Sequence, residues 1–197
     1  SRKEETMAKT AADFEGEFLA ELKGATGKDL KAWMTTCKKS GEEKHNALLK
    51  HLKAEHGFNH MQANLLTSIF MNGGRPVYGD IDGLMGAHFD GKASIKPIYA
   101  ALEKRVRAIF KTVEIVPTKG YISFRNQREF AVAKVTKKAL RVGMDLGDKP
   151  YSGRIEKAKS LGTMPRISHM VELFSSAEVD ADLVSFLKEA NQGVNVR

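Results

Sequence analysis

Apolar residues recur at helical spacing through the first 73 residues, and glycines or polar capping residues interrupt the runs. This periodicity is typical of short amphipathic helices joined by tight turns. Gly24 ends the first run, and Thr26 is placed to cap the second, in which Trp33 and Cys37 share the apolar face. The pattern predicts four helices: residues 11–23, a helix after Thr26 closed by Gly41, residues 42–56, and a helix capped by Asn59.

The period changes from 3.6 to 2 in the second half of the chain. One more helical stripe runs from Ile95 to Ile109, with Pro97 in its first turn, and alternating segments follow. Short connections between the segments favour antiparallel pairing. The alternation predicts strands at 112–116, 120–125, 129–135, 139–146 and 167–173, then a helix capped by Ser175 or Ser176. Residues 148–165 are predicted to form a long loop, and the residues of strand 139–146 predicted to face inward are Leu140, Val142, Met144 and Leu146.

Together these elements predict an α+β protein of two domains. Residues 1–73 form a four-helix bundle-like domain, and residues 92–197 form an antiparallel-sheet domain flanked by two helices. Between them, residues 74–91 are rich in glycine and isolated acids, which is typical of a linker. The composition, 42% apolar and 28% charged, is that of a folded globular chain.

Positive charge is concentrated in one block. The chain has a net charge of +8, but residues 92–166 alone carry 18 Lys or Arg against six Asp or Glu. A cationic surface attracts polyanions, although it also serves solubility. The charge map therefore directs the search for a partner to the sheet domain.

Apolar runs in the chain fall far short of the ~20 residues that a membrane-spanning helix needs. The segment from Ser1 to Thr10 lacks the apolar core of a signal peptide, and Ser1 to Thr6 precede a plausible natural start at Met7. Cys37 is the single cysteine and cannot form an internal disulfide. We expect a cytoplasmic protein with no membrane partner.

Motifs in both halves resemble known families. The sequences Thr26-Gly-Lys, Glu55-His-Gly and Ala63-Asn-Leu resemble a small bacterial helical family of unknown function. The sequences Pro117-Thr-Lys-Gly-Tyr-Ile-Ser-Phe-Arg and Ala177-Glu-Val-Asp resemble an α+β domain of unknown function that often follows it. The resemblance covers about residues 15–192 and implies this domain pair, without any catalytic residue.

The strand at 120–125 supplies the first candidate surface. Alternation places Tyr121, Ser123 and Arg125 on one face, where an aromatic ring can stack on a base and a guanidinium can grip phosphate. A polar sheet face with a partly covered aromatic would have the same pattern. The anion-binding residues predicted on this surface are Lys119, Tyr121, Arg125, Arg128, Lys134 and Arg166.

His169 is a second candidate, for ligand binding or catalysis. It shares an apolar strand face with Ile167 and Val171, which is typical of a core histidine, and a functional role requires a pocket with Tyr121 and Arg125.

Metal binding and cofactor binding are not predicted. Gly57 separates His56 from His60, so these histidines do not form an i, i+4 pair on one helix. Nucleophile elbows, phosphate-binding loops and dinucleotide fingerprints are absent from the sequence. Whether the protein is an enzyme stays open.

Three functional hypotheses follow. The first is a non-catalytic protein that binds nucleic acid or another polyanion through the basic face of the sheet domain. The second is a small-ligand pocket or enzyme centred on His169. The third is an adaptor that binds a protein partner through the helical domain.

Overall fold

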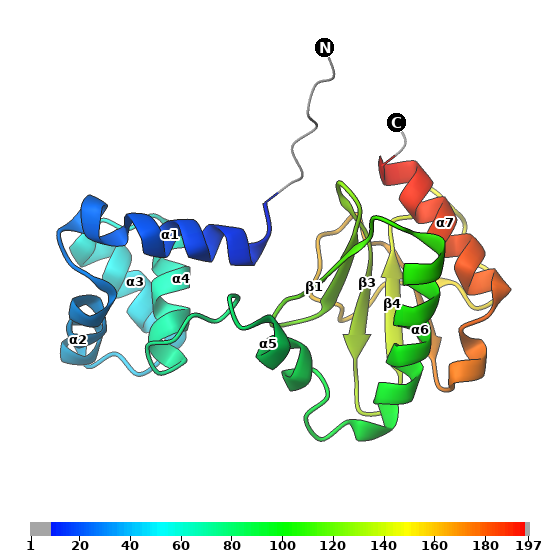
Figure 1. Ribbon diagram of the computed structural model, residues 1–197, viewed down its shortest axis with the longest axis horizontal. Coiled ribbons are helices and arrows are strands. Elements are labelled where there is room, and N and C mark those ends of the chain that lie inside the picture. Colours follow the sequence, from blue (N-terminus) through cyan, green and yellow to red (C-terminus); the bar gives the residue numbers. More distant parts are fainter. Residues whose placement is uncertain (1–8, 196–197) are drawn as a thin grey trace, which may run out of the picture. The chain divides into compact units, whose positions relative to one another are not determined.

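The computed structural model describes residues 9–195 and divides them into two compact units between Asp80 and Ile81. Residues 1–8, with which the predicted helical domain begins, and residues 196 and 197 lie outside the described residues. Helices come first and an antiparallel sheet follows, so the predicted α+β class is confirmed (Figure 1).

The helical unit contains four helices whose ends are defined by their caps. Gly27, Gly41 and Gly57 follow the first three helices with φ of 74°, 71° and 70°, the left-handed conformation that glycine adopts at least cost. Asn59 caps the fourth helix, as predicted, by accepting a hydrogen bond from the Gln62 N–H. The helices are α1 (Ala11–Thr26), α2 (Leu30–Ser40), α3 (His45–His56) and α4 (His60–Met71).

The predicted boundary between the first two helices is wrong. Helix α1 continues past Gly24 through Thr26, and Asp29 caps α2 by accepting from the Ala32 N–H. The Thr26 hydroxyl instead donates to the Leu22 carbonyl and accepts the indole N–H of Trp33 at 2.9 Å. The Thr26 hydroxyl thus serves as the hydrogen-bond acceptor that the buried indole N–H of Trp33 requires, and it does not cap α2.

A buried carboxylate closes the helical unit. Glu15 in α1 is 1% exposed, and its two oxygens accept hydrogen bonds from the backbone N–H groups of Val77, Tyr78 and Gly79 at 2.8–2.9 Å. These bonds fix the chain after α4 against the bundle. The segment interpreted as a linker is thus divided: residues up to Asp80 belong to the helical unit, and α5 (Ile81–Ala87) belongs to the sheet unit.

The sheet unit has six antiparallel strands in the order β1-β2-β3-β4-β6-β5. The two-residue strand β5 lies in the stretch that the sequence pattern assigned to a loop. The strands are β1 (Glu114–Pro117), β2 (Ile122–Arg125), β3 (Glu129–Val135), β4 (Leu140–Met144), β5 (Glu156–Lys157) and β6 (His169–Leu173). The other elements are η1 (Ala93–Ile95), α6 (Lys96–Ile109), η2 (Ser176–Glu178) and α7 (Ala181–Asn195).

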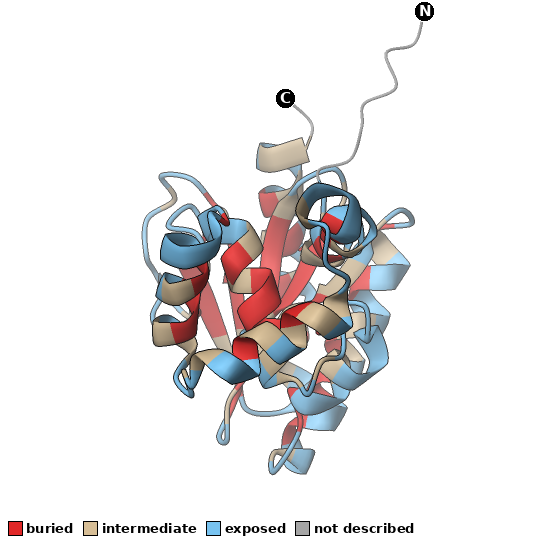
Figure 2. Ribbon diagram, turned by 90° about the vertical axis from the view of Figure 1, so that its left-hand side faces the viewer, coloured by how far each residue is buried: buried red, intermediate tan, exposed pale blue. Residues whose placement is uncertain are grey.

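One face of the sheet packs against α6 and α7 (Figure 1). Alternate strand residues such as Phe124, Val142 and Val171 point to these helices and bury the main core. In Figure 2 the visible strands are largely red, whereas the helices carry red, tan and pale blue segments. The predicted inward residues Leu140, Val142 and Met144 are fully buried on this face.

The opposite face is covered by the long loop of residues 145–168. Leu161 and Ile167 from this loop pack on Val132 and Met170 of the sheet. Gly143 makes this contact close, because a Cβ there would lie 2.5 Å from Leu161 Cδ1 and 2.8 Å from Ile167 Cγ2. The polar sheet face expected from the sequence is therefore largely covered. The candidate residues Lys119 and Arg128 lie in turns at its two ends.

Candidate functional site

The predicted anion-binding residues are divided between opposite ends of the sheet. Successive antiparallel strands place the β1–β2 and β3–β4 turns at one end, and the β2–β3 turn at the other. Lys119 lies in the β1–β2 turn, whereas Arg125 ends β2 and Arg128 lies in the β2–β3 turn. We call the first region the lysine end (Lys92, Lys119, Lys137 and Lys138) and the second the arginine cleft.

The arginine cleft is an open polar depression of about 860 Å³ at the end of the sheet, beside the last turn of α7. Three arginines line it, two from the β2–β3 region and one from the loop before β6, together with four carboxylates and two amide side chains. Its charged lining residues are Arg125, Arg128, Arg166, Glu129, Asp145, Asp148 and Glu189.

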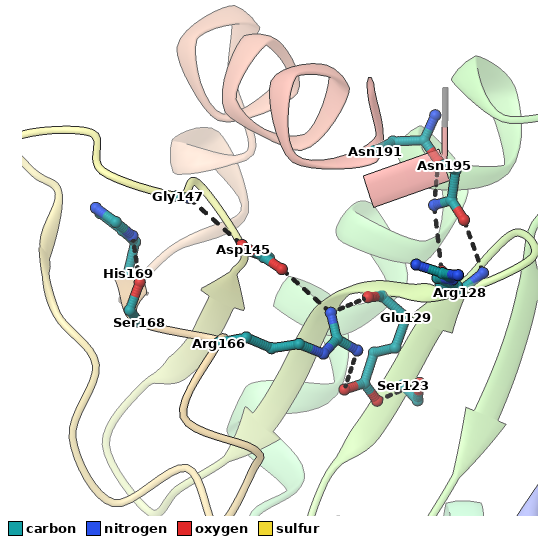
Figure 3. Close-up of polar contacts among 10 residues, drawn as sticks. All are labelled: Ser123, Arg128, Glu129, Asp145, Gly147, Arg166, Ser168, His169, Asn191 and Asn195. Carbon is teal, nitrogen blue, oxygen red and sulfur yellow. Dashed lines mark hydrogen bonds and ion pairs between the residues drawn. The ribbon is translucent and has the colours of Figure 1, made fainter. Parts of the chain in front are cut away.

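Arg166 bridges two acidic residues in this cleft (Figure 3). Its Nη1 donates to the Glu129 carbonyl at 2.6 Å and to Asp145 Oδ2 at 3.2 Å, and its Nη2 lies 3.6 Å from Glu129 Oε1. Glu129 also accepts a hydrogen bond from the Ser123 hydroxyl at 2.6 Å. Arg166 is therefore positioned, and its charge is largely compensated.

Arg125 extends this row of alternating charges across the sheet. The register pairs it with Glu114 on one side and with Glu129 on the other, and its Nε lies 3.9 Å from Glu114 Oε2. Arg125 is only 8% exposed. The predicted grip on phosphate is thus limited by burial and by neighbouring carboxylates.

Arg128 and Asp148 differ from the other charged residues in the cleft. Both are exposed, and within residues 9–195 neither side chain makes an ion pair or a hydrogen bond. The backbone of Arg128 is nevertheless fixed, because its N–H donates to Asn195 Oδ1 at 2.7 Å and its carbonyl accepts from Asn195 Nδ2 at 3.2 Å (Figure 3). One cation and one anion of the cleft are therefore available to a ligand.

The lysine end is built from two copies of one local turn. In Thr118-Lys-Gly-Tyr and Thr136-Lys-Lys-Ala, the threonine hydroxyl accepts from the backbone N–H groups two and three residues later, at 3.0–3.2 Å. Lys119 in the first turn and Lys137 and Lys138 in the second are exposed. Since the two turns are two strand spacings apart, their lysines are separated by roughly 10 Å.

Residues 88–92 tie the two turns together. The His88 ring Nε2 lies 2.7 Å from the Thr118 carbonyl and carries the proton that this acceptor requires. Lys92 Nζ donates to the Val135 carbonyl at 3.3 Å, immediately before the second turn. Burial lowers the pKa of His88, and the charges of Lys92 and Lys134 lower it further, against the opposing effect of the Thr118 hydrogen bond.

Lys134 and Tyr121 lie under the long loop. Lys134 Nζ donates to the Leu161 carbonyl at 3.2 Å, and Tyr121 packs against the small core that contains Leu161 and Ile167. Tyr121 is half-buried. These two side chains help to hold the loop and are less accessible to a ligand than the sequence pattern suggested.

His169 is not brought together with Tyr121 and Arg125. It is 1% exposed; its Nε2 lies 2.6 Å from the Lys149 carbonyl, and its Nδ1 lies 2.8 Å from the Ser168 hydroxyl. The Tyr151 ring packs on it at 4.9 Å. In Figure 3 it stands apart from the residues around Arg166. Both ring nitrogens are engaged within the fold, so we leave His169 out of the site.

Sequence reasoning missed several residues of both regions. Lys137 and Lys138 were assigned only to a turn, although the repeated Thr-Lys pair was a local signal for a shared geometry. The carboxylates of Glu129, Asp145 and Asp148 were not associated with the arginines. Spacing along the chain gives no indication of this pairing, because it depends on the antiparallel register.

The helical unit offers one apolar groove. It has a volume of about 100 Å³ and lies between α1 and the start of α4, with partly exposed Phe14 and Met61 on its sides. Glu17 and Glu21 also line it. This is the feature that bears on the adaptor hypothesis.

Residues 9–195 contain no cluster of three or more His, Cys, Asp or Glu arranged to hold a metal ion. In the same range, no helix is both long and apolar enough to span a bilayer. Burial raises the pKa of the Cys37 thiol to about 11, so its thiolate form is disfavoured.

The chain is an α+β protein with a basic sheet domain, and comparison with protein families assigns both of its units. Residues 85–192 match a family described as a domain of unknown function (DUF5655), and the match covers more than half of the chain. The chain therefore belongs to this family. Residues 17–71 match a second domain of unknown function (DUF4287). The predicted two-domain family resemblance is confirmed. Neither the curated proteins nor the solved structures gave a match.

Proposed function

We propose that the sheet domain binds nucleic acid or a similar polyanion, without catalysis, through the lysine end. The observation that supports this most strongly is the pair of Thr-Lys turns, which present Lys119, Lys137 and Lys138 on neighbouring hairpins. Neither turn contains an acidic residue. The two adjacent lysines of the second turn, Lys137 and Lys138, are both exposed.

Lysine suits this role physically. Its ammonium group is a compact charge on a flexible stem, so it pairs with phosphate without demanding one orientation. Turns separated by roughly 10 Å can contact several phosphates, which follow at about 3.4 Å of axial rise along a strand. We expect binding that depends on charge and not on base sequence.

The arginine cleft is the weaker choice for a polyanion, although it contains three of the residues predicted from sequence. Arg166 is held by Glu129 and Asp145, and Asp148 and Glu189 also line the cleft. A strand of phosphates would meet these carboxylates at close range. Of the predicted site residues, Lys119 thus lies in a region with different chemistry from that of Arg125, Arg128 and Arg166.

Binding across a salt series tests the proposal. We would titrate labelled single-stranded and duplex DNA and RNA with the full chain and with a Lys137→Gln/Lys138→Gln variant. Because each lost phosphate contact reduces the salt slope by about 1, the expected change is a slope flatter by about 2 and weaker binding at low salt.

A matched variant locates the effect. Arg128→Gln/Lys188→Gln removes the same charge from exposed positions outside the lysine end and should retain most of the affinity. Equal weakening in both variants would show that binding follows net charge and not the Thr-Lys turns. Absent or salt-independent binding of the unmodified chain would overturn the proposal itself.

Two further expectations accompany this proposal. We expect the protein to be cytoplasmic, since its single cysteine, Cys37, is buried and a reducing compartment keeps such a thiol reduced. A protein partner for the helical unit remains a separate proposal, based on the groove beside Phe14 and Met61.

A further inference from the structure

The arginine cleft has the size of a small-ligand site. Its volume of about 860 Å³ lies within the range of ~300–1,000 Å³ typical of ligand sites. It lies at the end of the sheet, where β2, β3 and β4 meet the last turn of α7. Its lining comes from segments as distant in sequence as Arg125 and Asn195, so it exists only in the folded domain.

The permanent charges of the cleft form a pre-organised floor. Glu114, Arg125, Glu129, Arg166 and Asp145 alternate in sign along the end of the sheet. Their mutual contacts hold the side chains in place, as pre-organised binding requires. Such a floor presents donors and acceptors together and favours neither an anion nor a cation overall.

Two charged side chains that line the cleft have no partner among the described residues. The Arg128 guanidinium is one, and Asn195 fixes its backbone through both the N–H and the carbonyl. The Asp148 carboxylate is the other, and it follows Gly147, whose φ of 59° turns the chain at the cleft. The carboxyl-terminal end of α7, which also lines the cleft, adds partial negative charge.

We propose that the arginine cleft binds a small zwitterion, with its anionic group on Arg128 and its ammonium group on Asp148. Guanidinium pairs with a carboxylate or a phosphate through two parallel hydrogen bonds. The acceptors of Asp148 and of the end of α7 suit an ammonium group. A ligand with both charges satisfies both uncommitted side chains, whereas a simple anion leaves Asp148 unpaired and in repulsion.

Three peptides of nearly equal size isolate the two contacts. Triglycine carries both charges, N-acetyltriglycine carries only the carboxylate, and triglycinamide carries only the ammonium. We would titrate each into the full chain and follow the NMR signals of the Gly147 and Gly193 amides and of the Asn195 side chain. Triglycine should bind about 1.4- to fivefold more tightly than either of the others, since an exposed ion pair contributes ~0.2–1 kcal/mol.

Phosphoethanolamine, in which a phosphate replaces the carboxylate, identifies the anionic group. Tighter binding than triglycine assigns a phosphate-containing zwitterion, and weaker binding assigns a carboxylate. Both results keep the proposal, because the ammonium and the pairing with Arg128 are common to both. If neither triglycine nor phosphoethanolamine shifts the NMR signals of the cleft residues, the proposal is contradicted.

Variants connect each contact to its residue. Arg128→Gln should remove the preference for triglycine over triglycinamide, and Asp148→Asn should remove the preference for triglycine over N-acetyltriglycine. Both positions are exposed, so folding should be unaffected, and thermal unfolding checks this. Equal binding of all three peptides, or preferences unchanged in the variants, would overturn the proposal.

This inference is independent of nucleic-acid binding at the lysine end. Lys137→Gln/Lys138→Gln should leave the peptide titrations unchanged, whereas Arg128→Gln should leave most of the affinity for nucleic acid. Each proposal can therefore fail while the other stands.

Discussion

The two ends of the sheet carry similar numbers of cations but differ in how these are held. At the lysine end, Lys119 and Lys137 project from turns that each threonine stabilises locally. At the arginine cleft, Arg166 contacts residues from two different strand ends. Exposed lysines on flexible stems suit a polyanion, whereas a compensated network of charges provides rigid donors and acceptors for a small ligand.

The same difference predicts distinct consequences for stability. Arg166 is connected to the fold, so its loss affects the loop and two carboxylates. Lys137 and Lys138 are exposed, and the backbone N–H of Lys138 donates to the Thr136 hydroxyl. Substitutions in the arginine cleft should therefore lower the stability of the fold. Substitutions at the lysine end should mainly weaken the binding of a polyanion.

The largest effect is expected for Gly143→Ala, between the two ends. The new Cβ would lie within 3 Å of Leu161, Ile167 and Val132 side-chain atoms, so the long loop has to shift. We expect a loss of about 1–3 kcal/mol in the free energy of unfolding, measured by urea denaturation. NMR signals around Arg166, which adjoins Ile167, should shift more than those of the Thr-Lys turns.

Gly120→Ala is the matched control for this prediction. Gly120 lies in the first Thr-Lys turn, has no positive φ, and has no atom within 4 Å of a Cβ. Its substitution should change the stability by less than about 0.5 kcal/mol. A Gly143→Ala variant as stable as the Gly120→Ala variant would contradict the close packing of the loop.

An intermediate effect is expected for Arg166→Gln. Glu129 and Asp145 would lose their shared partner while remaining partly buried, which should cost about 1–2 kcal/mol of unfolding free energy. Lys137→Gln removes the same charge and should stay within about 0.5 kcal/mol of the parent. Similar losses of stability in Arg166→Gln and Lys137→Gln would contradict the expected difference in stability between the two ends of the sheet.

The smallest effect concerns the ionisation of His88. Its folded-state pKa is lowered below the usual 6.5 by burial and by Lys92 and Lys134. The unfolded chain then binds more protons at acidic pH, so the unfolding free energy should fall as the pH drops below about 6.5. Chemical denaturation between pH 7.5 and 5 should show this slope, and His88→Gln should reduce it.

His88 also reports which end a ligand occupies. A polyanion at the lysine end should raise the His88 pKa by offsetting the charges of Lys92 and Lys134, as an NMR titration can show. Triglycine in the arginine cleft should not. A His88 pKa that is unaffected by bound oligonucleotide would place the nucleic acid elsewhere.

Local patterns predicted most secondary structure elements. The range of β3 was predicted without error at Glu129–Val135, and Leu140, Val142 and Met144 were correctly assigned to the core, because a buried strand face imposes a period of two. Asn59 was correctly identified as a helix cap, because its hydrogen bond from the Gln62 N–H involves only residues of the same turn. The error at Thr26 arose where a tertiary contact, the indole of Trp33, competed with the local rule.

The candidate sites were less predictable than the elements. Lys119, Tyr121 and Arg125 were grouped because they are near in sequence, yet the length of β2 separates Lys119 from Arg125. The face they share is covered by a loop anchored through Lys134. A strand pattern indicates which side a residue faces, but not what lies over that side.

By itself, the sequence determined the α+β class, the helices and strands, the positive charge of residues 92–166 and the two Thr-Lys turns. These properties follow from local periodicity, composition and hydrogen bonds within a few residues. Only the tertiary structure decided that Arg166 is held by Glu129 and Asp145, that His169 is buried, and that Arg128 and Asp148 share one cleft. The reason is physical: contacts between strand ends depend on register and chain reversal, which no local stretch of the sequence encodes.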